Sequence, residues 1–410
     1  MDADPARIVI VGAGHAGGAV AANLRQFGWR GPITLIGEEP LPPYQRPPLS
    51  KAWLKREADA ASLLLRPAAF YASNDIALRL EQRVTGIDRT ARQVRLATGS
   101  LVPYDRLVLA LGSVVRPLAV SGTELRGVLS LRNAADADRL QAALRPGARL
   151  AVIGGGYIGL EVAASARALG AAAVVIERED RVLARVAGPL LSDFFQRQHR
   201  ARGVQLELGA VVETLEGDGG AITGVRLRDG RLIPCDVALV GIGAVANDAL
   251  AQAAGLQCGG GIVVDATGRS SDPAIYAIGD CSNRPLPLYR RSVRLESVPN
   301  ALEMAKQAAA ALCGRPPPPS EVPWFWSDQF DLRLQIAGLL FDAVQTAVRG
   351  DPDSGRFAVF HLAADDTVQA VEAVNAPAEF MAGKLMIARR RRAAAEQLRD
   401  PACALQQLAA

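Results

Sequence analysis

Two copies of the glycine pattern G-x-G-x-x-G limit the possible folds of this chain more than any other feature. The first copy follows the apolar run Ile8–Val11 and supplies Gly12, Gly14 and Gly17. Glycines at this spacing let the backbone turn sharply from a buried strand into a helix and approach a pyrophosphate at the helix N-terminus. The second copy begins 142 residues later, at Gly154, after another apolar run. The pair predicts two dinucleotide-binding units in one chain.

A carboxylate follows the expected strand after each motif. Glu38 closes the apolar run Ile33–Ile36, 21 residues after the last glycine of the first motif. Glu177 closes Ala173–Ile176, 18 residues after the last glycine of the second. Carboxylates at this spacing accept hydrogen bonds from ribose hydroxyls, and one beside the 2′-position repels the phosphate of NADPH. Glu177 therefore favours NADH, a preference that the neighbouring Arg178 weakens.

An apolar strand ending in glycine closes each expected unit. Leu107–Gly112 has a later twin in Val237–Gly243, and the run Pro316–Pro319 is a clear linker. The second unit is expected to be inserted into the first, because features of the first unit resume after residue 240. We predict an α/β fold with two Rossmann-like dinucleotide-binding domains and a C-terminal α+β domain. The expected boundaries are 1–113 with 240–318, then 114–239, then 319–410.

Several charged residues near the motifs leave more than one interpretation open. The segment Pro42–Lys51 holds four prolines and is expected to be stiff and extended rather than helical. It could hold Arg46 and Lys51 over a cofactor, although the composition alone favours two surface cations. The negative charge of Glu161 is favoured in the first turn of a helix, because it interacts with the positive end of the helix dipole. Asp280 ends an apolar strand, where α/β sheets bind ligands, or else caps the next helix.

Bulk properties exclude several classes of protein. The net charge of +4 over 410 residues is too small for wholesale nucleic-acid binding. No run of 18 apolar residues indicates a membrane span. The five cysteines show no C-x-x-C spacing, and the opening Met1–Pro5 is acidic, unlike a secretory signal. We therefore expect a cytoplasmic protein with neither nucleic acid nor membrane as a partner.

Other polar residues receive no special role from the pattern. The run Arg389–Arg392 is expected to be a solvated helix face. The three histidines, His15, His199 and His361, are scattered and form no metal or triad constellation. No metal site is expected.

The chain resembles the FAD-dependent ferredoxin reductases of bacterial cytochrome P450 and dioxygenase systems, of the putidaredoxin reductase type. The similarity covers nearly the whole chain. It is carried by Arg46–Lys51, Gly154–Glu161, Ala277–Cys281, Glu296–Leu302 and Pro323–Gln329. The resemblance implies a glutathione reductase-like flavoprotein with FAD in 1–113 and 240–318 and NAD(H) in 114–239.

The resemblance also assigns roles position by position. Lys51 would lie beside the flavin ring and Glu161 near the nicotinamide, where it could pair with Lys51; these two are the candidate catalytic residues. The candidate FAD-binding residues are Gly12, Gly14, Ala16, Gly17, Glu38, Arg46, Lys51, Val84, Arg132, Asp280, Val298 and Trp326. The candidate NAD(H)-binding residues are Gly154, Gly156, Ile158, Gly159, Glu161 and Glu177.

The cysteines constrain how electrons leave such a protein. Pro42–Lys51, the loop in which relatives that reduce peroxide or coenzyme A disulfide carry a single cysteine, has none, and Cys281 has no partner nearby in sequence. The chain also lacks a cysteine set for its own iron–sulfur cluster. The resemblance then implies single-electron transfer to an external acidic [2Fe–2S] ferredoxin that serves a cytochrome P450. Its candidate docking residues are Arg290, Arg291, Arg294, Lys306 and Trp326, with Arg315 nearby.

Two alternatives remain at this point. The chain could be a rubredoxin reductase or the ferredoxin reductase of a dioxygenase system, which the sequence separates poorly. A different class is a signalling or DNA-binding flavoprotein similar to apoptosis-inducing factor. The low net charge argues against that class.

Overall fold

The computed structural model describes residues 6–410, and contacts between its residues divide the chain into two units. The acidic stretch 1–5 lies outside the described residues. Unit 1 comprises Met1–Gln45, Ala60–Val114 and Val245–Pro323. Unit 2 comprises Arg46–Asp59, Val115–Ala244 and Trp324–Ala410. Two of the boundaries between the units fall within β8 (residues 113–115) and β17 (residues 244–246).

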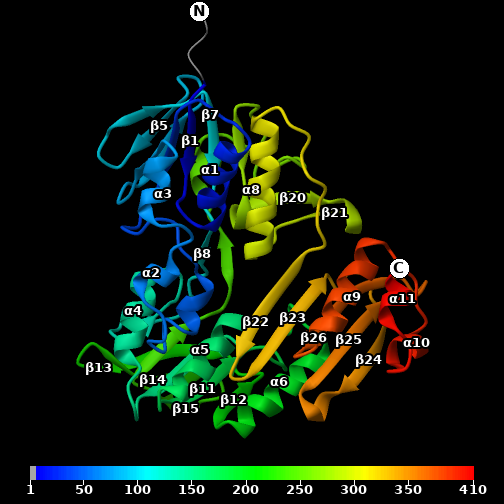
Figure 1. Ribbon diagram of the computed structural model, residues 1–410. Coiled ribbons are helices and arrows are strands. Elements are labelled where there is room, and N and C mark those ends of the chain that lie inside the picture. Colours follow the sequence, from blue (N-terminus) through cyan, green and yellow to red (C-terminus); the bar gives the residue numbers. More distant parts are fainter. Residues whose placement is uncertain (1–5) are drawn as a thin grey trace, which may run out of the picture. The chain divides into compact units, whose positions relative to one another are not determined.

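Unit 1 is built on a parallel sheet with the strand order β19-β7-β1-β2-β3. Its strand β1 is buried throughout because both faces of a parallel sheet are covered. Helices α1 and α8 pack against each other and lie side by side in Figure 1. The bounds are β1 Ile8–Val11, β2 Ile33–Ile36, β3 Ile76–Arg79, β7 Arg106–Leu109, β19 Ile275–Ala277, α1 His15–Gln26 and α8 Val298–Leu312.

Two small sheets and three short helices complete unit 1. One antiparallel sheet contains β4 (Val84–Asp88), β5 (Gln93–Leu96) and β6 (Leu101–Pro103). The other contains β18 (Ile262–Val263), β20 (Ser282–Leu286) and β21 (Arg291–Val293). The helices are α2 (Ala60–Leu63), α3 (Ala68–Ser73) and α7 (Ala249–Ala253).

Unit 2 repeats the parallel design with the strand order β12-β11-β10-β16-β9. The apolar run of the second motif forms β10, which pairs in parallel with β11 and β16. The bounds are β9 Val128–Leu129, β10 Arg149–Ile153, β11 Ala172–Glu177, β12 Val204–Leu208, β16 Val237–Val240, α4 Ala134–Ala143, α5 Tyr157–Ala168 and α6 Pro189–Ala201. An antiparallel hairpin sheet, β13 (Val212–Asp218), β14 (Ala221–Leu227) and β15 (Leu232–Pro234), is attached to it.

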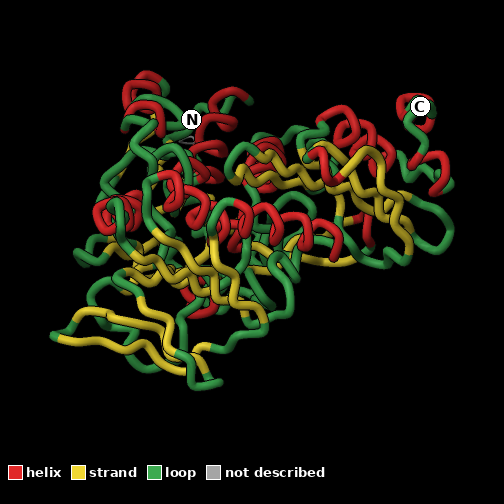
Figure 2. Tube along the Cα trace, turned by 90° about the horizontal axis from the view of Figure 1, so that it is seen from below, coloured by secondary structure: helices red, strands yellow, loops and turns green. Residues whose placement is uncertain are grey.

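The C-terminal part of unit 2 is an antiparallel sheet with the order β22-β23-β26-β25-β24. Helix α9 packs against β26 and β23 of this sheet. In Figure 2, helices (red) lie next to strands (yellow) in the part of the chain near the C-terminus. The α/β class is confirmed, with an antiparallel sheet domain at the C-terminus. The bounds are β22 Trp324–Gln329, β23 Leu332–Gly338, β24 Gln345–Asp351, β25 Arg356–Leu362, β26 Val368–Val374, α9 Pro377–Ala388, α10 Ala395–Arg399 and α11 Leu405–Ala409.

The C-terminal tail is fastened along β24, the last strand of that sheet. The Arg349 guanidinium of β24 donates to four carbonyls of the tail, those of Leu398, Asp400, Pro401 and Cys403. Arg399 of α10 donates back to the carbonyl of β24 at Thr346, at 2.9 Å.

Two local expectations need correction. Pro47–Ser50 is a 3-10 turn rather than extended chain, because prolines at the first helical positions have the right φ and lack an N–H that a helix start leaves unpaired anyway. The run Arg389–Arg392 is exposed as expected but follows α9 instead of lying on it. Arg390 has a φ of 51°, which terminates the helix. No helix within residues 6–410 combines the length and apolarity needed to cross a membrane.

Candidate functional site

The first glycine motif forms an open cradle in unit 1. Gly12 has a φ of 110°, and a Cβ there would lie 2.2 Å from the carbonyl oxygen of Ala110. A Cβ on Gly17 would lie 1.8 Å from the carbonyl oxygen of Gly12, so the helix can approach the strand only with glycine. Gly14 is the N-cap of α1, no side chain caps it, and no atom lies within 4 Å of a Cβ built there. The backbone N–H groups of the first turn therefore face open space that suits a phosphate.

The second motif repeats this geometry in unit 2. Gly154 also has a φ of 110°, and a Cβ on Gly159 would lie 2.2 Å from its carbonyl oxygen. Gly156 is the uncapped N-cap of α5 with nothing within 4 Å of its Cβ position. Ile158 in the first turn of α5 is 47% exposed, beside the open N-terminus. Both cradles fit a dinucleotide pyrophosphate.

The two expected ribose carboxylates differ in their surroundings. Glu177 accepts hydrogen bonds from the backbone N–H of Gly155 at 2.6 Å and of Glu179 at 2.9 Å, so its carboxylate is fixed beside the second cradle. Glu38 is largely exposed, and its nearest charged partner is Arg83, at 3.7 Å. An exposed carboxylate of this kind can leave its long ion pair with Arg83 and accept hydrogen bonds from ribose hydroxyls instead.

Three other candidate FAD residues lie on the strand ends and helix start of unit 1. Ala16 is buried, and a Cβ on Gly279 would lie 3.2 Å from its own Cβ. Asp280 accepts a hydrogen bond from Ser113 Oγ at 3.2 Å. Val84 begins β4 and is half-buried.

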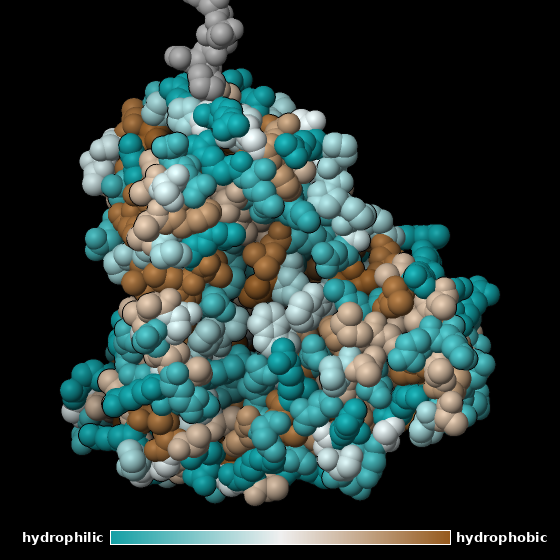
Figure 3. Space-filling model, viewed as in Figure 1, coloured by the Kyte–Doolittle hydropathy of each residue, from teal (hydrophilic) through white to brown (hydrophobic). Residues whose placement is uncertain are grey.

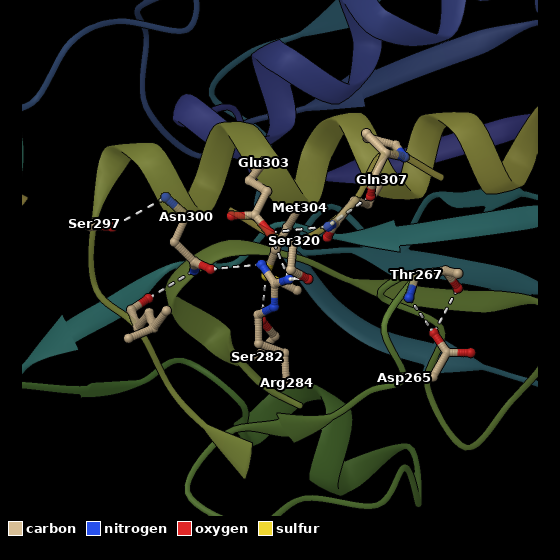
Figure 4. Close-up of polar contacts among 12 residues, drawn as sticks. Asp265, Thr267, Ser282, Arg284, Ser297, Asn300, Glu303, Met304, Gln307 and Ser320 are labelled. Atoms are coloured by element: carbon tan, nitrogen blue, oxygen red, sulfur yellow. Dashed lines mark hydrogen bonds and ion pairs between the residues drawn. The ribbon is translucent and has the colours of Figure 1, made fainter. Parts of the chain in front are cut away.

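Helix α8, which begins at the candidate residue Val298, is held by a buried polar network (Figure 4). Ser297 caps the helix by accepting from the N–H of Asn300 at 3.2 Å. The fully buried Arg284 donates to Asn300 Oδ1 at 3.2 Å and to Glu303 Oε1 at 2.8 Å. This network fixes the first turns of α8 relative to β20.

Lys51 and Glu161 form an ion pair within unit 2. Lys51 Nζ lies 2.6 Å from Glu161 Oε2, and Ser50 Oγ donates to the same oxygen at 2.5 Å. The side chain of Glu161 is only 4% exposed and that of Lys51 18%. The 3-10 turn before Lys51 and helix α5 bring the two together. Lys51 also donates to the carbonyl of Pro47, at 3.2 Å.

Three buried residues that the sequence pattern does not single out extend the hydrogen bonding from Glu161. Ser327 Oγ donates to Glu161 Oε1 at 2.6 Å, and Gln329 Nε2 donates to Ser327 Oγ at 3.1 Å. His199 Nε2 lies 2.8 Å from Gln329 Oε1. Burial lowers the pKa of His199 to about 4, so the ring is neutral at physiological pH. The available signal was the period of two along β22, which places Ser327 and Gln329 on the same face as the aromatic Phe325.

The same face of β22 holds an aromatic contact to the second motif. Phe325 stacks on Tyr157 of α5 with ring centroids 4.5 Å apart, and burial raises the pKa of the Tyr157 hydroxyl. Trp326 points to the other face, where it is half-buried with its ring centroid 5.6 Å from that of Trp324. In the same unit, Arg46 donates to the carbonyl of Arg132.

The candidate docking cations of unit 1 are not equivalent. Arg290, Arg291 and Lys306 are exposed. Arg294 is engaged with Glu296 and with the carbonyl of Asp280. Arg315 lies over the ring of Phe27, at 5.5 Å. The face shown in Figure 3 is mainly hydrophilic with several small apolar patches.

The cysteines offer no reactive pair among the described residues. All five are free thiols. Complete burial raises the pKa of Cys281 to about 12, so its thiol is protonated at neutral pH and is a poor nucleophile.

Comparisons with known proteins extend over nearly the whole chain. Residues 6–305 match the family of pyridine nucleotide-disulphide oxidoreductases, and residues 324–409 match a reductase C-terminal domain. A probable ferredoxin reductase, CtmF, from Castellaniella defragrans is 55% identical over 96% of this chain and 97% of its own. The ferredoxin–NAD(+) reductase component of an anthranilate 1,2-dioxygenase system from Burkholderia cepacia is 42% identical over 99% of each chain. A crystal structure of the covalent putidaredoxin reductase–putidaredoxin complex superposes with a TM-score of 0.96 at 42% identity, covering 99% of this chain and 98% of that one.

Proposed function

The chain belongs to the pyridine nucleotide-disulphide oxidoreductase family, and within it to the ferredoxin reductases; from this premise we propose that it transfers electrons from NADH to a [2Fe–2S] ferredoxin of a cytochrome P450 system. The family implies FAD and NAD(H). We assign FAD to 1–113 with 240–318 and NAD(H) to 114–239. When bound, these cofactors supply hydride transfer and the release of electrons one at a time.

The observation that carries this proposal is the Lys51–Glu161 pair. An ammonium held at 2.6 Å by a nearly buried carboxylate has a fixed position. Beside a flavin ring, such a cation stabilises the negative charge that a hydride brings. Lys51 would therefore provide the electrostatic contribution, and Glu161 positions its ammonium.

The nucleotide preference in the proposal is for NADH. The Glu177 carboxylate is fixed beside the second cradle by two backbone N–H groups. The guanidinium of Arg178, which would otherwise attract a 2′-phosphate, pairs with Glu179 at 2.7 Å. A phosphate at the 2′-position would therefore meet the Glu177 carboxylate, while the guanidinium of Arg178 is shared with Glu179.

An external acceptor is supported by the state of the cysteines. A buried, protonated Cys281 without a disulfide partner cannot take electrons as a redox-active pair would. Exposed cations at Arg290, Arg291 and Lys306 suit an acidic protein partner. Five free thiols also suit the reducing cytoplasm, which we propose as the location.

The test compares acceptors under identical conditions. The FAD-loaded protein is supplied with NADH and cytochrome c, and ferredoxins of the P450 and dioxygenase types and a rubredoxin are added separately. We expect cytochrome c reduction to depend on added ferredoxin and to have the highest kcat/KM with the P450-type ferredoxin. Faster turnover with rubredoxin would refute the assignment of the acceptor.

The dioxygenase system is the second candidate, since a relative from an anthranilate dioxygenase system matches at the same identity as the putidaredoxin reductase structure. A higher kcat/KM with a dioxygenase ferredoxin would establish it. A gel-shift assay at physiological salt tests the signalling class, for which tight DNA binding would be required.

A further inference from the structure

A continuous chain of buried hydrogen bonds connects Lys51 to a histidine on another helix of unit 2. It runs from the Lys51 ammonium to Glu161, then through Ser327 and Gln329 of β22, and ends at His199 of α6. Glu161 is 4% exposed, and the other three non-lysine members are fully buried. Such a chain of buried polar groups needs every link satisfied, because an unpaired buried group destabilises the fold.

The direction of every hydrogen bond in the chain follows from the carboxylate. Ionised Glu161 has no hydrogen to give, so the single hydroxyl hydrogen of Ser327 goes to it. Ser327 Oγ must then accept from the amide group of Gln329, which turns the amide oxygen toward His199. His199 must therefore carry its proton on Nε2. His199 Nδ1 has no hydrogen-bond partner in the structure, which suits a neutral ring with a bare Nδ1.

All donors consequently point toward Glu161. Ser327 is the one hydrogen-bond donor to Oε1 among the residues described, while Oε2 receives Lys51 and Ser50. Each donor is held by the next one along the chain, so the two carboxylate oxygens are held in distinct places. A carboxylate that lost the bond at Oε1 could rotate and release Oε2 from Lys51.

We propose that Ser327, Gln329 and His199 are positioning residues for Lys51, acting through Glu161 so that the carboxylate stays aimed at the ammonium. The proposal rests on the proposed function for the place of Lys51 beside the flavin. It does not depend on which ferredoxin accepts the electrons. The C-terminal sheet then takes part in arranging the site, because its strand β22 supplies Ser327 and Gln329.

A buried histidine–carboxylate pair, His361 and Glu372 on β25 and β26 of the C-terminal sheet, provides a matched control. His361 Nε2 lies 2.9 Å from Glu372 Oε2, and Glu372 Oε1 accepts from the backbone N–H of Gly188 at 2.8 Å. No hydrogen bond connects this pair to Glu161 within the described residues. Its disruption should lower stability without altering Lys51.

The first test is the tautomer of His199. The chain has three histidines, so ¹⁵N NMR of the histidine-labelled, FAD-loaded protein gives few signals, which His199→Gln assigns. We expect His199 as the neutral Nε2–H tautomer near pH 7. A proton on Nδ1 would reverse the direction of the hydrogen bonds from His199 to Glu161 and overturn the proposal.

The second test is the chemical reactivity of Lys51. The chain has four lysines, at 51, 55, 306 and 384, so competitive acylation followed by mass spectrometry reports Lys51 against the other three. Ser327→Ala and His199→Leu should each raise Lys51 labelling about 5-fold, because each variant loses one hydrogen bond worth about 1 kcal/mol. His199→Gln, which keeps a donor near the place of Nε2, should stay close to the wild type.

Controls separate positioning from folding and from the partner assignment. Gln329→Met interrupts the series of hydrogen bonds at nearly constant side-chain volume. It replaces Ser327→Ala if that variant does not fold. His361→Leu should lower the unfolding temperature and leave Lys51 labelling unchanged. Equal labelling in all variants, or a rise with His361→Leu as large as with Ser327→Ala, would refute the proposal. Both measurements omit ferredoxin, so a wrong acceptor does not affect them.

Discussion

Replacing Gly14 by alanine should separate FAD binding from the stability of unit 1. Gly14 has φ −91° and ψ −161°, which alanine adopts without strain. A Cβ there meets no atom within 4 Å. The free energy of unfolding of the apoprotein should therefore change by less than about 1 kcal/mol, and in the stabilising direction because the unfolded chain loses entropy.

The same methyl group occupies the space that a pyrophosphate needs. Displacing a phosphate from the first-turn N–H groups of α1 removes hydrogen bonds to a charged group, each worth about 1.5–3 kcal/mol. Loss of one such bond corresponds to about a 10- to 100-fold weaker binding of FAD. The Kd is measured by titrating apoprotein with FAD and following the quenching of flavin fluorescence. Thermal unfolding of the same samples reports the fold.

Two other glycines serve as matched variants. Gly12→Ala should destabilise unit 1 even without FAD, because its φ is 110° and the new Cβ would lie 2.2 Å from the carbonyl oxygen of Ala110. Gly156→Ala should weaken NADH binding and leave the Kd for FAD unchanged. If Gly14→Ala binds FAD as tightly as the wild type, the cradle at α1 does not hold the pyrophosphate.

Four further predictions concern charge. Lys51→Met should slow reduction by NADH about 10- to 100-fold in stopped-flow absorbance with FAD retained, and unchanged kinetics would remove Lys51 from the catalytic residues. His199, whose pKa falls from 6.5 to about 4 on burial, should make stability decrease as pH falls from 6.5 to 4, because only the unfolded chain takes up the proton. The decrease is at most about 3 kcal/mol in urea unfolding, and His199→Gln should remove this part of the pH dependence. Arg284→Met should lower the free energy of unfolding by about 3–5 kcal/mol, because it leaves Glu303 without its cation. An unchanged unfolding temperature would contradict the role of that network. Added salt should lower kcat/KM for ferredoxin and leave reduction of an uncharged quinone by NADH nearly constant, whereas equal salt effects would argue against docking by Arg290 and Arg291.

The sequence was sufficient for the parts of the fold that repeat a local pattern. Apolar strands followed by G-x-G-x-x-G identified both parallel sheets, since glycine spacing and strand burial are local properties. The pattern did not reveal that the short segment 46–59 packs with unit 2, because that depends on contacts between residues more than 100 positions apart, such as Ser50 with Ser165. The series of hydrogen bonds from Glu161 to His199 could not be predicted for the same reason. A serine and a glutamine in a strand acquire meaning only when α5 and α6 are placed against them.

The fastened C-terminal tail has a consequence for the solubility of this protein. Strand β24 is the last strand of the C-terminal sheet, and such an edge presents backbone groups that can pair with another chain. Arg349 and Arg399 bind the tail along this strand, so the final residues act as a cover for the edge. A chain that ended before α10 would expose β24 as a template for intermolecular strand pairing. Its folding yield should then fall with concentration, even though neither glycine cradle had been altered.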